Sequence, residues 1–227
     1  MSTASIPHYT LLGAGDTTLS LILESLARRH PSGVRATIAT NVAFDETVPW
    51  ATPGVETEML DHALWAAQLN GAIPANCISG VYKPATKQAV FAFFRDHYGV
   101  QEAHYTVLQH PGVDRALTVE VDPGTFIGPQ VAIAPYTRLG KLVSINRGCT
   151  VGHHTVLGAY CTLNPGVQVA GKCRVGRAVT IGMGAKVVDG VRIGDGSVIG
   201  AGALVTKDVP SGVLAYGVPA RIKAELD

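Results

Sequence analysis

The chain has 227 residues, of which 47% are hydrophobic and 15% are charged, and its formal net charge is +1. This near-neutral balance argues against nucleic acid or an anionic membrane as the main partner, and no stretch reaches the roughly twenty apolar residues of a membrane-spanning helix. The first residues, MSTASIPHY, lack the basic and apolar regions of a secretory signal, so we expect a cytoplasmic protein.

The first 110 residues alternate between strand-like and helix-like patterns. Strands are predicted over 8–13, 34–40, 75–79 and 104–109, and helices over 17–30, 58–68 and 85–98, with a loop rich in proline and acidic residues at 41–58. The order strand, glycine turn, helix, strand is typical of a small doubly wound domain. We therefore predict a Rossmann-like α/β domain over 1–110.

A glycine turn follows the first predicted strand at Gly13-Ala14-Gly15. Such a turn can seat a phosphate on the N-terminus of the next helix. It is only a fragment of the longer dinucleotide fingerprint, and the second strand ends at Thr40-Asn41 with no acidic residue for a ribose. A ligand loop and a plain strand-to-helix turn both stay open.

The remaining residues carry an unbroken six-residue repeat. An aliphatic residue returns at every sixth position, namely Val121, Ile127, Ile133, Leu139, Ile145, Val151, Leu157, Leu163, Val169, Val175, Ile181, Val187, Ile193, Ile199 and Val205. Short strands joined by corners at this period close a three-sided prism with eighteen residues per coil. The pattern resembles the left-handed parallel β-helix of the hexapeptide acyltransferases, and we predict that fold over 111–227.

The position after each aliphatic residue is nearly always small or turn-forming, as in Asn146, Gly152 and Gly158. We interpret this position as the corner residue with positive φ, which Gly and Asn tolerate. Cys149, Cys161 and Cys173 fall two residues before an aliphatic position, so we expect them to be buried in the core, as is Cys77 in its apolar run.

Two histidines form one corner of the repeat, which contains no others. His153 and His154 could take a proton from an amine or hydroxyl nucleophile, although a pair of plain surface histidines is the alternative. A zinc site would need about three ligands, and the residues one coil away are Pro135, Tyr136, Gly171 and Lys172. We expect no metal.

Other corner residues have both a functional and a structural interpretation. The backbone N–H of Gly171, one coil beyond His153, could act as an oxyanion donor. Asn146 could serve the site or only the turn. A column of glycines could leave a smooth groove for a long thin ligand, or could reflect turn geometry alone; its members are Gly182, Gly184, Gly200 and Gly202.

The whole chain resembles bacterial sugar acetyltransferases that join a Rossmann-like domain to a left-handed β-helix, such as the bacillosamine and perosamine N-acetyltransferases and the sialic acid O-acetyltransferases. Three blocks carry the resemblance: LLGAGDTTLSLILESL, ISGVYKPATKQAVFAFF, and INRGCTVGHHTVLGAYCTLNPGVQVAGKCRVG with the GAGALVTKDVP…GVPARI ending.

The resemblance implies an acetyl-CoA-dependent acetyltransferase that acts on an amino or hydroxyl group of a sugar. Its active sites lie between adjacent subunits of a homotrimer. It makes His153 the general base, places Asn146 beside the acceptor, and aims the Gly171 N–H at the acetyl carbonyl. It assigns the acceptor to Gly13, Gly15 and Lys83, and acetyl-CoA to Thr162, Gly171, the glycine column, Lys207, Pro219 and Arg221. The sugar nucleophile attacks the thioester directly, with no acyl-enzyme.

Three departures from the family pattern qualify these expectations. His154 stands where amino-sugar members often have a carboxylate, and Thr162 replaces a second histidine that helps bind the thioester. Asp16 and Thr17 replace the small and aromatic residues usual in the glycine turn, and an acidic residue would repel a diphosphate. A non-sugar acceptor and a catalytically silent scaffold therefore stay open as alternatives, as does the choice between N- and O-acetylation.

Overall fold

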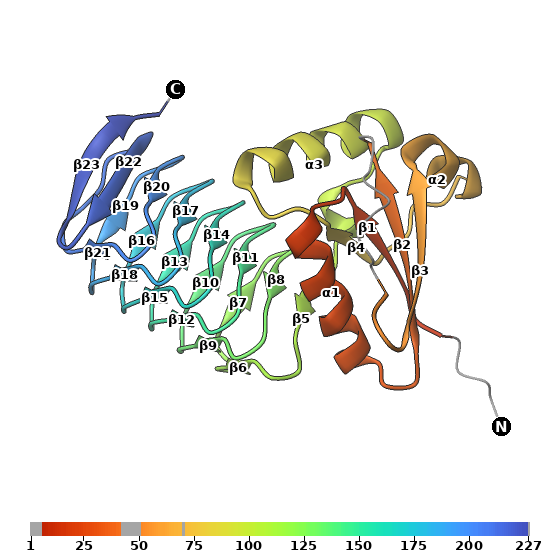
Figure 1. Cartoon of the computed structure of the whole chain (residues 1–227), viewed down its shortest axis with the longest axis horizontal. Coiled ribbons are helices and arrows are strands. Elements are labelled where there is room, and N and C mark those ends of the chain that lie inside the picture. Colours follow the sequence, from red (N-terminus) through yellow and green to blue (C-terminus); the bar gives the residue numbers. More distant parts are fainter. Residues whose placement is uncertain (1–5, 42–50, 70, 227) are drawn as a thin grey trace.

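The computed structural model describes residues 6–41, 51–69 and 71–226, except for the side chains of Asp16 and Thr17. Half of the loop predicted at 41–58, residues 42–50, lies outside the described residues, as does the predicted effect of the Asp16 side chain. Figure 1 shows an α/β part joined to a long ladder of short strands, with the two termini at opposite ends of the molecule. No helix in the described ranges is long and apolar enough to cross a membrane.

The α/β part contains a four-stranded parallel sheet in the order β3-β2-β1-β4. Its strands are β1 (His8–Leu12), β2 (Val34–Thr40), β3 (Val55–Asp61) and β4 (Cys77–Ser79), and its helices are α1 (Asp16–Arg29), α2 (His62–Gln68) and α3 (Pro84–Tyr98). Neighbouring residues of a strand face opposite sides. Leu11 packs in the cluster of α1, whereas Leu12 packs with Trp65 of α2 and Phe94 of α3, so helices cover both faces.

Two predictions for this part were wrong. Residues 55–61 form strand β3, and the following helix begins at His62 rather than near residue 58. Residues 104–109 do not add a strand to the first sheet. They contain the end of a 3₁₀ turn (η1, Glu102–His104), an isolated bridge from Tyr105 to Cys77, and β5 (Leu108–Gln109), which pairs with β8 of the repeat.

The repeat forms three parallel sheets around one core, consistent with the predicted left-handed β-helix (Figure 1). Sheet 1 contains β5, β8 (Phe126–Ile127), β11 (Ser144–Ile145), β14 (Thr162–Leu163), β17 (Thr180–Ile181), β20 (Val198–Ile199), β22 (Val213–Gly217) and the antiparallel β23 (Ala220–Glu225). Sheet 2 contains β6 (Asp114–Arg115), β9 (Ala132–Ile133), β12 (Thr150–Val151), β15 (Gln168–Val169), β18 (Lys186–Val187) and β21 (Leu204–Val205). Sheet 3 contains β7 (Glu120–Val121), β10 (Arg138–Leu139), β13 (Val156–Leu157), β16 (Arg174–Val175) and β19 (Arg192–Ile193).

The predicted six-residue period is confirmed strand by strand. Each aliphatic position is the second residue of one strand from β7 to β21, and those after Val121 are all buried. Residues eighteen apart pair in register, as Val151 does with Ile133 and Val169. The prism begins earlier than the pattern indicated, at β5 and β6, because these two strands end in Gln109 and Arg115 rather than in an aliphatic residue.

The corner interpretation needs correction. Positive φ falls three residues after each aliphatic position from Val121 to Ile199, for example at His154 (57°) and Gly148 (67°), and not at the residue directly after it. The directly following glycines are required by stacking instead: a Cβ on Gly152 would lie 2.4 Å from the backbone of Ala170 in the next coil. The proposed positive φ of Asn146 is therefore wrong, since its φ is not among the positive values.

Sheet 1 is the side of the prism that carries the α/β part. Lys87 of α3 is 1% exposed, and its ammonium donates to the carbonyl oxygens of Leu142 (2.8 Å) and Cys161 (2.9 Å) and to Ser144 Oγ (3.3 Å). Burial lowers the pKa of Lys87 to about 7. Since all three acceptors belong to the coils, this lysine fastens the helix to the prism.

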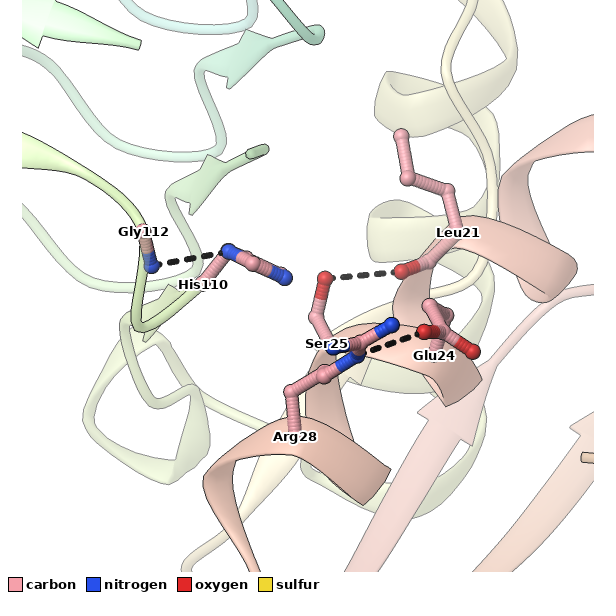
Figure 2. A network of polar contacts seen from close by, with 6 residues as sticks. All are labelled: Leu21, Glu24, Ser25, Arg28, His110 and Gly112. Carbon is pink, nitrogen blue, oxygen red and sulfur yellow. Dashed lines mark hydrogen bonds and ion pairs between the residues drawn. The ribbon is translucent and has the colours of Figure 1, made fainter. Parts of the chain in front are cut away.

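Helix α1 meets the first coil at His110. Figure 2 shows the His110 imidazole lying between Gly112 and the side chains of Ser25 and Arg28. Nδ1 of His110 accepts from the Gly112 N–H at 2.9 Å, while Arg28 is paired with Glu24 on the helix (2.8 Å). Burial and the nearby Arg28 lower the pKa of His110, so this contact favours the neutral imidazole.

Candidate functional site

The two predicted histidines lie together at a corner between sheets 2 and 3, which is the edge of the prism opposite sheet 1. Their Nδ1 atoms are 3.1 Å apart, and the rings meet edge to face at 5.3 Å between centroids. The ring of Tyr136, one coil below, packs on His154 at 4.9 Å. Both histidines are exposed, so a ligand can reach them.

The other nitrogen of His153 faces Gly171 in the next coil. An added Cβ on Gly171 would lie 2.8 Å from His153 Nε2 and also 2.8 Å from Asp189 Oδ1. Among the described residues, the Gly171 N–H has no hydrogen-bond partner. The structure therefore brings a ring nitrogen and a carboxylate beside a residue whose backbone N–H has no partner, and a ring nitrogen and a free N–H are groups that can act as a base and as an oxyanion donor in acyl transfer.

Two grooves lie on the C-terminal half of the prism. One, of about 550 Å³, lies over sheet 3 and is lined by Arg174 and Arg192 among others. Arg174 also donates to the carbonyl oxygen of His154 (2.7 Å). A second groove, of about 440 Å³, is lined by Lys207 and Arg221, so these two predicted residues lie together. Cationic side chains along such a path suit a phosphate-bearing ligand.

A second group of predicted residues lies on a different edge, the corner between sheets 1 and 2. This group contains Asn146, Gly182, Gly184, Gly200 and Gly202. The Asn146 side chain accepts from the Arg147 N–H at 2.8 Å. A Cβ on Gly182 would lie 2.5 Å from the backbone of the next coil, and Gly184 has a φ of 68°, which favours glycine, so backbone geometry alone accounts for these two glycines. Within a single chain, this group and His153 lie on different edges of the prism.

Two further predicted cofactor residues lie apart from the corner. Thr162 is 3% exposed, and its hydroxyl donates to the carbonyl oxygen of Tyr82 at 2.5 Å, beneath the α/β part. That hydroxyl would have to leave Tyr82 to reach a cofactor, so its cofactor role stays a prediction. Pro219 lies in the exposed turn between β22 and β23, after a cis peptide bond.

The predicted acceptor residues gather at the carboxyl ends of β1 and β4. Gly13 follows β1 with a φ of 81°, Gly15 is the N-cap of α1, and Lys83 is the N-cap of α3. Gly80, after β4, approaches so closely that a Cβ on it would lie 1.9 Å from the Gly13 carbonyl oxygen. The two loops are thus packed against each other at one edge of the sheet.

The cysteines have neither nucleophilic nor metal-binding surroundings. All four are buried and free, as predicted, and burial raises the pKa of Cys149 and Cys161 to about 11 and that of Cys77 to about 12. In the described part of the chain no three His, Cys, Asp or Glu side chains are grouped to hold a metal ion.

Sequence reasoning missed Asp189, Arg174 and Arg192. Asp189 lies 36 residues from His153, whereas the search for partners extended only one coil of eighteen. The two arginines occupy outward positions of sheet 3 at a spacing of eighteen, so the repeat itself carried the signal.

Comparison with known proteins agrees with the fold. The bacterial transferase hexapeptide family (six repeats) matches residues 172–207. The structure of PerB from Caulobacter crescentus, solved with CoA and GDP-perosamine, is 30% identical, with 99% of this chain and 100% of that chain covered and a TM-score of 0.79. Structures of perosamine N-acetyltransferase with a histidine changed to asparagine or alanine match at 29% identity.

More distant structures share the fold. The acetyltransferase domain of PglB from Neisseria gonorrhoeae is 19% identical over 96% of this chain and 100% of that chain, with a TM-score of 0.78. WeeI from Acinetobacter baumannii is 22% identical over the same shares, with a TM-score of 0.72. No curated protein sequence gives a significant match. The full-length similarity and the hexapeptide repeats show that the chain belongs to the bacterial sugar acetyltransferases built on a hexapeptide-repeat β-helix.

Proposed function

We propose that this protein transfers the acetyl group of acetyl-CoA to an amino group of a nucleotide-linked sugar. The observation that carries the proposal is the histidine corner, where His153 Nε2 lies 2.8 Å from the point that a Cβ of Gly171 would occupy, while its Nδ1 contacts His154. The full-length likeness to an enzyme solved with CoA and GDP-perosamine supports the same donor and acceptor classes.

His154 takes the orienting role that a carboxylate has in related enzymes. A hydrogen bond between two imidazoles needs one donor and one acceptor nitrogen. When His153 donates from Nδ1 to Nδ1 of His154, the lone pair of His153 is on Nε2, facing Gly171, which is the tautomer a base requires. The Tyr136 ring, packed on His154, restricts its rotation.

The chemistry follows from this arrangement. The sugar amine attacks the thioester carbon, forming the C–N bond, while Nε2 of His153 takes a proton from the nitrogen. The Gly171 N–H donates to the carbonyl oxygen as it gains negative charge. The C–S bond then breaks, and the imidazolium returns its proton to the CoA sulfur. No cysteine is needed, which agrees with the raised pKa values of the buried thiols.

The donor would lie along the edge between sheets 2 and 3. Lys207 stands three coils beyond His153, about 14 Å at strand spacing, and lines a groove with Arg221. The acetyl end would meet Gly171 and the phosphates would meet the cationic C-terminal groove. Thr162, Pro219 and the glycine column keep their predicted cofactor roles only as proposals.

The acceptor would be held by the α/β part, which we propose is a Rossmann-like domain over 1–110, with the β-helix over 111–227. The sheet order β3-β2-β1-β4 supports this, and Gly13, Gly15 and Lys83 lie where such sheets bind ligands. Because the α/β part covers sheet 1, it lies opposite its own His153. A complete site thus needs the α/β part of another subunit, which supports the predicted homotrimer.

In such a trimer, the two edges of sheet 2 could also belong to one site. The edge with Asn146 and the glycine column from one subunit would face the edge with His153 from its neighbour. We also keep the cytoplasm as the proposed location, because acetyl-CoA and nucleotide-linked sugars are both found there.

The test combines binding and turnover. Acetyl-CoA at about 100 times its dissociation constant should add roughly 2.7 kcal/mol to the free energy of unfolding, visible as a higher melting temperature. Thiol release is then followed with amino-sugar nucleotides, beginning with GDP-perosamine. His153→Ala should lower kcat about 10²–10⁴-fold, and the control His97→Ala, at an exposed site on α3, should not.

Each outcome separates the alternatives. No stabilisation by millimolar acetyl-CoA would support a silent scaffold and sink the proposal. Stabilisation with thiol release only for sugars that lack an amino group would establish O-acetylation. Thiol release only with non-sugar amines would establish a non-sugar acceptor.

A further inference from the structure

One line of residues follows the edge between sheets 2 and 3. His153, Gly171, Asp189 and Lys207 are eighteen residues apart, and the strands before them pair in register from Thr150 through Lys186 to Leu204. The backbone of Asp189 therefore stands two coils from that of His153, about 10 Å at ordinary strand spacing.

The side chains of His153 and Asp189 reach into this gap from its two sides and meet beside Gly171. Its Oδ1 and His153 Nε2 each lie 2.8 Å from the point where a Cβ of Gly171 would stand, so at most twice that distance separates them. The two atoms are not bonded to each other, since the ion pairs among the described residues do not include them. Gly171 keeps the space between them free of side-chain atoms.

Asp195 shows what an aspartate on the next corner of the same coil does. Its Oδ1 accepts from the Arg177 N–H of the preceding coil at 2.8 Å, so that carboxylate supports the backbone. The corresponding bond from the Gly171 N–H to Asp189 is not formed. In the described part of the chain, the Asp189 carboxylate thus accepts no hydrogen bond. Its Oδ1 lies on the same side of Gly171 as Nε2 of His153, the proposed base.

We propose that Asp189 is a positioning residue for acetyl transfer, a role that rests on the proposed function. When Nε2 of His153 takes the proton of the attacking amine, the carboxylate faces the new imidazolium and stabilises its charge. The proton then passes to the CoA sulfur, and Asp189 stays ionised throughout. Similar charge pairing makes an imidazole a stronger base in other enzymes.

The other groups around His153 do not supply this negative charge. His154 contacts Nδ1, and the Tyr136 ring packs on His154. Arg174 donates to the His154 carbonyl oxygen, and Lys172, directly after Gly171, bonds through its backbone N–H to the His153 carbonyl oxygen. Arg174 and Lys172 are cationic residues, so neither supplies the negative charge that Asp189 carries.

The test compares Asp189→Asn with Asp195→Asn, the same change on the same coil. Proton NMR follows the titration of the His153 ring, assigned with His153→Ala, in the free protein. At a separation of about 5 Å in water, the lost charge should move the midpoint about 0.5 pH unit lower in Asp189→Asn and leave it unchanged in Asp195→Asn. An equal midpoint in wild type and Asp189→Asn would overturn the proposal.

Turnover provides the second measurement. In Asp189→Asn the acidic limb of kcat/KM should move to lower pH by the same amount, and the plateau should fall about tenfold. A loss that appears only as weaker acetyl-CoA binding, with an unmoved acidic limb, would make Asp189 a donor contact and refute the inference. Absence of turnover in wild type would refute the proposed function, while the NMR result would still decide on Asp189.

Discussion

Replacing Gly171 with alanine tests whether the corner between sheets 2 and 3 is the reaction site. The φ of Gly171 is not positive, so alanine fits the backbone. Its Cβ would lie 2.8 Å from His153 Nε2 and Asp189 Oδ1, against an ordinary contact of 3.4 Å or more, so the imidazole must move by about 0.6 Å. Since a 1 Å misplacement can cost about 10²-fold, we expect kcat/KM to fall roughly 10–100-fold in a thiol-release assay.

Stability distinguishes a local effect from misfolding. His153 and Asp189 are exposed and can swing aside, so Gly171→Ala should keep its melting temperature. The control Gly196→Ala has a φ of 69° and open space around its Cβ, on the corner between sheets 3 and 1. It should lose about 1 kcal/mol of stability yet keep its activity. Full activity in Gly171→Ala would refute the assignment of this corner.

Four predictions concern contacts between segments that are distant in the sequence. Lys87→Met removes three buried hydrogen bonds to the coils and should lower the free energy of unfolding by about 2–4 kcal/mol in urea, whereas Lys186→Met on the exposed face of sheet 2 should change it by less than about 0.5 kcal/mol. Because burial lowers the pKa of Lys87 to about 7 while the unfolded chain keeps that proton up to about 10.4, wild-type stability should rise from pH 7 to 10, and a rise that persists in Lys87→Met would contradict this. Burial also lowers the pKa of His110, so stability should fall as the pH drops below about 6.5, and His110→Asn, which keeps an acceptor but does not titrate, should weaken that fall in thermal melts. Gly80→Ala places a Cβ 1.9 Å from the Gly13 carbonyl oxygen and should cost about 3 kcal/mol by the same urea assay; a neutral result would show that the two loops can separate freely.

Much of the candidate site followed from residue type and spacing. The pair His153-His154 was evident because no other corner of the repeat carries a histidine, and Gly171 was found because it stands one coil away. The contact between the two Nδ1 atoms was not predictable, since it depends on the side-chain torsions that a φ of 57° at His154 permits. Asp189 was missed because its carboxylate reaches past Gly171, a position without a side chain in the intervening coil.

By itself, the sequence determined the period, and the period determined the prism. A six-residue spacing of aliphatic positions has one way to bury every one of them, so the core and its cysteines followed from local pattern. The tertiary structure alone decided that residues 108–109 pair with the coils, that Lys87 fastens α3 to them, and that the predicted cofactor residues do not all lie on one edge of the prism. These outcomes depend on how separate segments pack in space, which no local spacing encodes.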